Sequence, residues 1–468
     1  MSAVSANTIT EATGTRSPGS PADNPAAPVT PDSPPDPNAP VIVVGAGPVG
    51  IRLVQELERQ HPGRLILLFG GEPWKPYNRV KLSSLLAGEI SEADIDTSET
   101  IPLTDNITAL FNAPIREIDP EHRVVTGHDG SRYPYSKLVL ATGSRPFVPP
   151  IPGVGLSGIF SFRDLSDAQQ LLARTASSRH TLVVGGGLLG LEAAKAMCRH
   201  HTEVTVVEHA NHVMFNQLDS LAASLLADSL EESGVAVMSK VRVQEFIGEH
   251  RLEGALLSSG ETIPCDTVVL STGIVPNIDL AKAAGLNTGR GVIVNDQMQS
   301  SDPDIYAIGE CAEHRGTIYG LVAPGYDQAS VAAAHIASAP TDSGTPADSR
   351  QQAVKFASYE GSVAATSLKV VGLPVFSMGD IQDRDFVQIA HRYSDPDSGT
   401  YRKLTVDAGK LVGVVSIGPW GEIPRLREAV IGRRQLYPWQ LWRFRRTGTL
   451  WGDDDTEEVA SWPRDATV

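Results

Sequence analysis

Two short apolar runs, each followed at once by glycines, organise the first two thirds of the chain. They occupy residues 41–44 and 181–184. An uninterrupted apolar run predicts a strand that is buried on both faces, as in a parallel sheet. The segments that follow read as two helices and two further strands, at residues 51–60, 188–200, 65–69 and 204–207. The pattern therefore predicts two βαβ units.

Stretches of different composition surround these units. Residues 1–39 carry hardly any large apolar side chain, so we expect a disordered N-terminal arm. Ser, Thr, Pro, Asp and Gly dominate residues 339–352, which indicates a linker. Strand-like runs at residues 403–406 and 411–417 flank a turn, and they predict a small α+β domain over residues 353–430.

The tail at residues 431–468 is first rich in aromatic and basic side chains and then acidic. Aromatic and Arg side chains are enriched at protein interfaces, so residues 443–446 form a candidate docking surface for an acidic redox protein. The alternative is that the aromatic side chains pack onto their own domain. The sequence leaves both interpretations open.

Composition excludes several classes of function. Apolar residues make up 41% of the 468 residues, which is typical of a globular protein, and the net charge of −16 disfavours nucleic-acid binding. Cys198, Cys265 and Cys311 are too far apart for a disulfide framework or a Cys-X-X-Cys metal site. No apolar run has the length of a membrane span, and the N-terminus lacks a signal-peptide pattern. We expect a cytoplasmic protein without a metal, and a homodimer remains open.

A glycine fingerprint follows the first predicted strand. It consists of Gly45, Ala46, Gly47, Pro48, Val49 and Gly50. In a strand–turn–helix setting, such glycines allow a tight turn and a close approach of the backbone to a pyrophosphate at the helix N-terminus. Gly70 and Gly71 follow the second strand, so Glu72 is the first carboxylate available to bind a ribose. Alternatively, Glu72 is a solvated turn residue.

The second fingerprint contains Gly185, Gly187, Leu188 and Gly190, and Glu208 follows at the end of the next strand. A carboxylate at this place accepts hydrogen bonds from the 2′-hydroxyl of an adenosine ribose and repels a 2′-phosphate. No Arg or Lys follows directly to bind such a phosphate. The unit therefore predicts NADH as the ligand, with NADPH possible.

Further motifs resemble those of the FAD-dependent pyridine nucleotide-disulfide oxidoreductases. The motifs lie at residues 138–146 with Ala141, Thr142, Gly143 and Arg145, at residues 268–273 with Thr272 and Gly273, and at residues 304–312 with Gly309 and Glu310. Within that family, residues 76–84 and 319–326 look most like the flavoprotein part of the NAD(P)H nitrite reductase large subunit. Rubredoxin and ferredoxin reductases are similar.

The resemblance implies an α/β fold with two Rossmann-like dinucleotide-binding domains of the three-layer ββα type and a C-terminal α+β interface domain. The FAD-binding domain would comprise residues 40–150 and 272–338, and the NAD(P)-binding domain residues 151–271. The resemblance further implies that Arg79, Lys81 and Glu310 bind FAD. Pro324 would begin a helix at residues 329–337 whose N-terminus faces the flavin.

Two residues are candidates for catalysis by resemblance. Glu192 corresponds to a family glutamate near the nicotinamide, and Lys81 is expected to pair with it. The place where disulfide reductases of the family carry cysteines reads Leu82-Ser83-Ser84-Leu85-Leu86 here. No thiol relay is therefore expected.

These features predict a reductase that passes hydride from NADH to FAD and then electrons to a redox protein. That partner would be a rubredoxin, a ferredoxin, or an iron–sulfur component of nitrite or nitrate assimilation. The alternatives are an NADH oxidase or diaphorase, and a flavin-based redox sensor that gates a partner.

Overall fold

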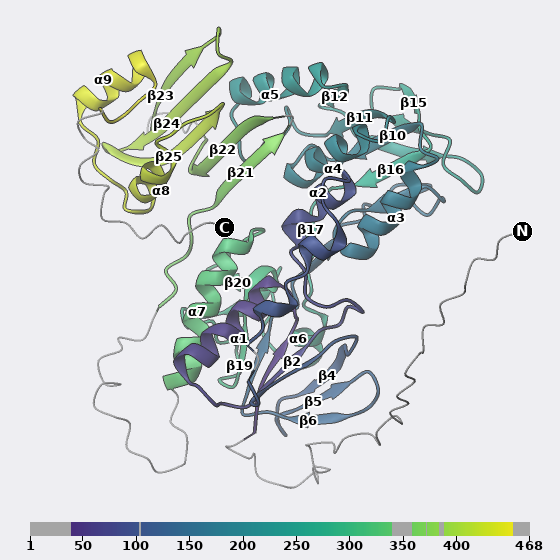
Figure 1. Ribbon diagram of the computed structural model, residues 1–468, viewed down its shortest axis with the longest axis vertical. Helices are drawn as coiled ribbons and strands as arrows, with labels where there is room; N and C mark the ends of the chain where they lie inside the picture. The colour runs from purple at the N-terminus through teal and green to yellow at the C-terminus, as the bar shows by residue number, and fades with distance from the viewer. Residues whose placement is uncertain (1–38, 103, 339–357, 371, 383–387, 453–468) are drawn as a thin grey trace, which may run out of the picture.

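The computed structural model describes residues 39–102, 104–338, 358–370, 372–382 and 388–452. The predicted linker, the arm before Ala39 and the acidic end of the tail lie outside the described residues. Figure 1 shows a lower lobe, an upper lobe that contains α3 to α5, and a third lobe that carries α8 and α9. No helix in the described ranges is long and apolar enough to cross a bilayer.

The lower lobe is the predicted FAD-binding domain. Its five-stranded parallel sheet has the order β19-β7-β1-β2-β3. Two helices lie on one face of this sheet, and a three-stranded antiparallel sheet lies on the other (Figure 1). The elements are β1 (Val41–Val44), β2 (Ile66–Phe69), β3 (Ile107–Leu110), β7 (Lys137–Leu140), β19 (Ile305–Ala307), helices α1 (Pro48–Gln60) and α7 (Val322–Ser338), and strands β4 (Ile115–Asp119), β5 (Val124–Gly127) and β6 (Arg132–Pro134).

Apolar periodicity explains these elements. All four residues of β1 are buried, as expected for a central strand covered on both faces. In α1, Leu53, Val54 and Leu57 recur at helical spacing and are fully buried. Their burial fixes the helix with its N-terminus at the glycine turn.

The upper lobe repeats this plan as the predicted NAD(P)-binding domain. Its parallel sheet has the order β12-β11-β10-β16-β9, with a second, antiparallel sheet of three strands. The elements are β9 (Ile159–Ser161), α3 (Leu165–Thr175), β10 (His180–Val184), α4 (Leu188–Cys198), β11 (Glu203–Glu208), α5 (Ser220–Glu232), β12 (Val235–Ser239), β16 (Thr267–Leu270), and strands β13 (Val243–Ile247), β14 (Gly254–Leu257) and β15 (Thr262–Pro264).

Short elements connect and flank these two domains. The chain crosses between them twice, and the crossing strands pair as an antiparallel ribbon. The ribbon is β8 (Ser144–Pro146) with β17 (Ile274–Pro276), and the remaining short elements are α2 (Leu82–Leu86), α6 (Asp279–Ala283), β18 (Val292–Val294) and β20 (Ala312–His314).

The third lobe contains a five-stranded antiparallel sheet in the order β21-β22-β25-β24-β23, and its central strand β25 is buried on both faces. Val415 lies in one core with α4 and α5, whereas its neighbour Val414 lies in a core with two C-terminal helices. The elements are β21 (Ala365–Val370), β22 (Leu373–Gly379), β23 (Gln388–Asp395), β24 (Thr400–Asp407), β25 (Lys410–Ile417), α8 (Ile423–Ile431) and α9 (Pro438–Thr447).

The core of this lobe continues past residue 430, where the sequence analysis ended the domain. Phe444 and Leu450 have no exposed surface, and Trp451 is 6% exposed. The tail as far as Trp451 is therefore part of the C-terminal domain, because its apolar side chains complete the core above the sheet.

Candidate active site at two nucleotide-binding loops

The first glycine loop joins β1 to α1 and has two glycines that no other residue could replace. A Cβ on Gly45 would lie 2.1 Å from the Ala141 carbonyl oxygen, and Gly45 has a φ of +121°. A Cβ on Gly50 would lie 1.9 Å from the Gly45 carbonyl oxygen. Gly47 differs, because a Cβ there would meet nothing within 4 Å. The open space at Gly47, the N-cap of α1, fits a pyrophosphate at a helix N-terminus.

The second loop, between β10 and α4, repeats this arrangement. A Cβ on Gly185 would lie 2.2 Å from the Ser271 carbonyl oxygen, and one on Gly190 would lie 2.0 Å from the Gly185 carbonyl oxygen. Gly187 is again open, caps the helix N-terminus and precedes Leu188. Both loops thus leave their middle glycine free for a phosphate group.

Glu208 lies at the end of β11, beside the second loop. Its carboxylate accepts hydrogen bonds from the backbone N–H groups of Gly186 and Ala210, both at 2.7 Å. His209 Nδ1 lies 2.8 Å from the same carboxylate. These contacts hold the carboxylate next to the open glycine, where a ribose hydroxyl would meet it.

Glu72 is bonded within its own turn. It forms an ion pair with Arg79 and accepts a hydrogen bond of 2.8 Å from the Tyr77 hydroxyl. The same hydroxyl accepts a hydrogen bond of 3.1 Å from the backbone N–H of Leu165, in the upper domain. Burial raises the pKa of Tyr77 above its ordinary value, so this hydroxyl stays neutral. Glu72 and Arg79 therefore form one cluster at the end of the first βαβ unit.

Glu310 follows β19 and carries the carboxylate of the third motif. Ser144 donates a hydrogen bond of 2.6 Å to it, and Arg163 forms an ion pair with it. Arg163 also donates to the Ser144 hydroxyl at 2.9 Å. No local sequence motif marks Arg163, and its carboxylate partner lies 147 residues away along the chain.

Helix α7 packs against the first glycine loop. It begins at Val322, earlier than the predicted range of 329–337, because Pro324 fits a first helical turn whose N–H groups have no intrahelical partner. A Cβ on Gly325 would lie 2.5 Å from Val49 Cγ2, so this helix start touches the fingerprint. Gln328, which the sequence analysis did not select, accepts a hydrogen bond of 2.7 Å from the Gly309 N–H.

The crossing ribbon brings the two glycine–threonine motifs together. Thr142 donates to the Asn277 carbonyl oxygen at 2.8 Å, and the Asn277 amide donates back to the Thr142 carbonyl oxygen at 2.9 Å. Thr272 donates to the Phe147 carbonyl oxygen at 2.6 Å. Arg145 lies on this ribbon with half of its side chain exposed, and it is bonded to Asn277 and Asp279. Ala141, Gly143 and Gly273 complete the two turns.

The predicted pair of Lys81 and Glu192 is not present in the structure. Lys81 donates to the Asp94 carbonyl oxygen at 3.2 Å and is exposed, because it precedes α2 and points toward the following turn. Glu192, on α4, instead lies beside Ser83 of the adjacent α2, whose hydroxyl acts to lower its pKa. Burial raises the pKa of Glu192, although the Ser83 hydrogen bond and the charge of Lys195 oppose this shift.

Comparison with known proteins agrees with this geometry. Residues 39–336 match the family model of the pyridine nucleotide-disulphide oxidoreductases, and residues 365–433 match the rubredoxin NAD+ reductase C-terminal domain. The chain belongs to the pyridine nucleotide-disulphide oxidoreductase family. Both the predicted family and the predicted fold class are confirmed.

Relatives of this chain have different lengths. It is 38% identical to the NAD(P)H nitrite reductase of Bacillus subtilis over 388 residues. The aligned region covers 82% of this chain and 46% of the relative. It is 35% identical to the rubredoxin-NAD+ reductase of Ectopseudomonas oleovorans over 60% of this chain and 74% of the relative. A ferredoxin reductase from Rhodopseudomonas palustris superposes with a TM-score of 0.76 at 27% identity, over 86% of this chain and 97% of the other. The chain spans about half the length of the nitrite reductase.

None of the three cysteines belongs to helix α2. Cys311 is fully buried, and its thiol is bonded to the carbonyl oxygens of Leu140 and Ile308. Burial raises the pKa of the Cys265 thiol to about 12. Cys198 is half-buried at the end of α4 and bonded to the Ser233 carbonyl oxygen. All three are free thiols, and none lies in the segment at residues 82–86.

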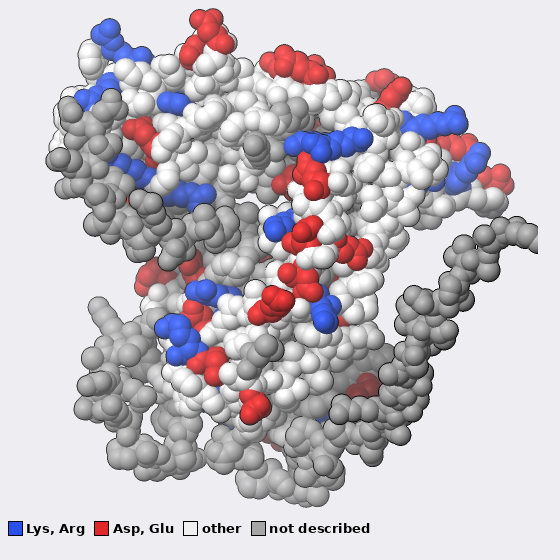
Figure 2. Space-filling view, in the orientation of Figure 1, with Lys and Arg blue, Asp and Glu red and all other residues white. Residues whose placement is uncertain are grey.

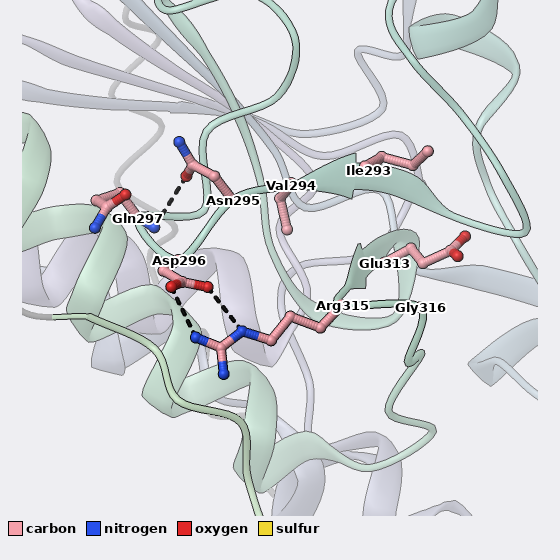
Figure 3. Close-up of a pocket in the computed structure, with 8 residues that line it drawn as sticks. All are labelled: Ile293, Val294, Asn295, Asp296, Gln297, Glu313, Arg315 and Gly316. Carbon is pink, nitrogen blue, oxygen red and sulfur yellow. Dashed lines mark hydrogen bonds and ion pairs between the residues drawn. The ribbon is translucent and has the colours of Figure 1, made fainter.

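A hollow of about 460 Å³ lies elsewhere, beside β18 and β20 of the lower domain (Figure 3). It is lined by Ile293, Val294, Asn295, Asp296, Gln297, Glu313, Arg315 and Gly316. Asp296 is already paired with Arg315 at 2.7 Å and with His314 at 2.8 Å. None of the fingerprint residues lines this hollow, so we assign it no role in nucleotide binding.

Proposed function

We propose that this oxidoreductase uses NADH to reduce bound FAD and delivers electrons to a redox protein. The observation that carries the proposal is the pair of glycine loops, each with an open middle glycine at a helix N-terminus. The lower loop would hold the FAD pyrophosphate, with Glu72, Arg79, Arg163 and Glu310 around the rest of the cofactor. The upper loop and Glu208 would hold the NADH. FAD, when bound, accepts a hydride from reduced nicotinamide and passes electrons on.

The chain itself binds and orients the two nucleotides. The N–H groups at the starts of α1 and α4 have no intrahelical partners and would donate to the phosphates. The Glu208 carboxylate is held by two N–H donors and would reject a 2′-phosphate by charge repulsion, which supports NADH over NADPH. Glu192 and Ser83 would line the nicotinamide side of the site.

Two observations support a protein acceptor. Residues 365–433 match the C-terminal domain of rubredoxin NAD+ reductase, and α2 presents Ser83 and Ser84 where a disulfide relay would need thiols. The relatives include a nitrite reductase, so an iron–sulfur component of nitrite or nitrate assimilation is a second acceptor of the same chemical class. The three free thiols support a reducing, cytoplasmic location.

The test is a comparison of acceptors with FAD-loaded protein and NADH. We expect rubredoxin or a [2Fe–2S] ferredoxin to be reduced with a higher kcat/KM than dioxygen, and a small dye to be reduced as well. A faster reaction with dioxygen than with either carrier would identify an NADH oxidase. A reduced complex that persists and transfers electrons to none of these acceptors would identify a redox sensor.

A further inference from the structure

The carboxylate proposed to bind the NADH ribose has a histidine in contact with it. His209 directly follows Glu208 at the end of β11, and its Nδ1 atom lies 2.8 Å from Glu208 Oε1. The two side chains differ in exposure, which is 66% for His209 and 9% for Glu208. Solvent therefore reaches the imidazole ring, which can gain or lose a proton while the carboxylate stays in place.

The contacts of the carboxylate decide which imidazole nitrogen gains that proton. Oε2 of Glu208 accepts a hydrogen bond from the Gly186 N–H, and Oε1 accepts one from the Ala210 N–H. An ionised carboxylate has only acceptor atoms, so it would repel a bare lone pair on His209 Nδ1. Nδ1 therefore carries its hydrogen in both protonation states, and the extra proton binds at Nε2. The pair then changes from one net negative charge to none.

Two further cations follow β12 at the same edge of the sheet. The Lys240 N–H donates to the Ala210 carbonyl oxygen at 2.9 Å, and the Val241 N–H donates to the Glu208 carbonyl oxygen at 3.0 Å. These bonds place Lys240 and Arg242 beside the end of β11, and both residues are exposed. Lysine and arginine side chains keep their charge at neutral and mildly acidic pH, so the variable charge here belongs to histidine.

The second histidine of this loop is held by its own neighbours. His212 Nδ1 lies 3.0 Å from the Val213 carbonyl oxygen, and its ring centroid lies 5.2 Å from that of Phe215. Figure 2 shows acidic and basic side chains interspersed over the visible face of the upper lobe. Because salt screens distant charges, the groups at the ends of β11 and β12 set the charge that a nucleotide meets there.

We propose that His209 determines how strongly this site discriminates between NADH and NADPH, and that it makes the discrimination depend on pH. The inference rests on the proposed function, in which Glu208 binds the adenosine ribose. When the imidazole is neutral, the carboxylate charge repels the 2′-phosphate of NADPH. When His209 is protonated, the pair has no net charge and Nε2 becomes an additional donor for the phosphate. NADPH then binds better, while the ribose of NADH meets the same carboxylate.

The test measures kcat/KM for NADPH and for NADH, with FAD-loaded protein and a dye acceptor, from about pH 8 to about pH 5.5, across the range in which histidine titrates. The ratio of the two values cancels pH effects on the dye, the flavin and the fold. In wild type this NADPH/NADH ratio should rise about fivefold or more toward acidic pH, because one charge a few ångströms from the phosphate has an effect of this size. Dissociation constants of NADP+ and NAD+, measured by calorimetry with the oxidised protein, give the same comparison for binding alone.

Two variants separate the histidine from the nucleotide. A 2′-phosphate itself takes up a proton at about pH 6, and this smaller change is the only one that His209→Gln should retain. His209→Lys carries its charge throughout, so its ratio at about pH 8 should exceed that of wild type about fivefold. His180→Gln is the matched control and should follow wild type. His180 lies 3.1 Å from Glu203 and is 46% exposed, but both residues start their strands, at the opposite edge of the sheet.

Two results would overturn the proposal and leave the proposed function intact, provided that wild type prefers NADH at high pH. One is a pH dependence of the ratio that is equal in wild type and His209→Gln. The other is a ratio in His209→Lys that does not exceed that of wild type. A wild-type preference for NADPH at high pH would instead contradict the role of Glu208 and, with it, this proposal.

Discussion

Arg163 and Glu310 form an ion pair across the boundary between the upper and the lower domain. Arg163 follows β9 of the upper domain, and Glu310 follows β19 of the lower domain. Both side chains are largely buried, with 22% and 16% exposed. The carboxylate proposed to contact FAD is therefore positioned by a residue of the other domain.

Replacement of this arginine tests its role. Arg163→Ala should raise the FAD dissociation constant about tenfold or more, because a hydrogen bond to a charged group contributes about 1.5–3 kcal/mol. Flavin fluorescence released on dilution measures this. The control is Arg174→Ala, since Arg174 has a similar exposure and pairs with Asp266 within the NAD-binding domain. Equal flavin retention in both variants would show that Arg163 has no part in FAD binding.

Substitutions at the open glycines should weaken nucleotide binding and leave folding nearly unchanged. Gly47→Ala places its Cβ in free space at a φ of −75°, so the thermal midpoint should fall by no more than about 3 °C. FAD binding should nevertheless weaken, because the methyl group occupies the space proposed for the pyrophosphate.

The second loop provides the matched variant. Gly187→Ala should raise KM for NADH and leave the flavin bound. Gly45→Ala, whose Cβ would lie 2.1 Å from a carbonyl oxygen, should instead disrupt the fold. If Gly47→Ala retained FAD with wild-type affinity, the pyrophosphate would have to lie elsewhere.

Glu208 should set the nucleotide preference. We expect wild type to show a higher kcat/KM with NADH than with NADPH, and Glu208→Arg to narrow or invert the ratio. The variant also loses the acceptor of two backbone N–H groups, so it should be less stable than wild type. Glu208→Gln retains an acceptor oxygen without the charge and separates the two effects. A wild-type preference for NADPH would contradict the assignment.

Glu192 should make stability depend on pH. Burial raises its pKa in the folded protein, so folding favours the protonated carboxyl group. This contribution to stability is fully present below the ordinary pKa of glutamate and is lost as the pH rises through the raised value. Glu192→Gln mimics the protonated form, and its advantage in the free energy of unfolding should therefore grow from acidic to neutral pH.

Urea unfolding of both proteins at several pH values measures this difference. Asp228→Asn, an exposed carboxyl-to-amide change on helix α5, is the control for the substitution itself. A constant difference between Glu192→Gln and wild type across the pH range would mean that Glu192 is not held in a buried setting.

The parts of the fold that local sequence determines could be predicted. Apolar runs at residues 41–44 and 181–184 identified the central strands, and the glycines after them identified both loops. Strand burial and tight turns depend on neighbours within a few residues, so periodicity and glycine spacing suffice. Glu208 could be placed for the same reason, because it ends the strand next to the second loop.

Contacts between distant segments could not be predicted. Arg163 and Gln328 carry no local motif, and their partners lie in other elements. The pairing of Lys81 with Glu192 failed because α2 begins at Leu82, which presents Ser83 to α4 and leaves Lys81 on the turn before it. The tail could not be assigned to the C-terminal core, since Phe444 and Trp451 gain their burial only from the sheet beneath them.

The shared core of the NAD-binding and C-terminal domains has a mechanical consequence. Tyr401 donates a hydrogen bond of 2.6 Å to Asp219 at the start of α5, and the buried Lys403 lies 3.3 Å from the same carboxylate. The two domains thus share one core. The ribbon of β8 and β17, the Arg163–Glu310 ion pair and the packing of α2 against α4 connect them to the lower domain. Because this core is shared, a force on the C-terminal sheet would be transmitted to α5 and to the second glycine loop's domain without an intervening linker.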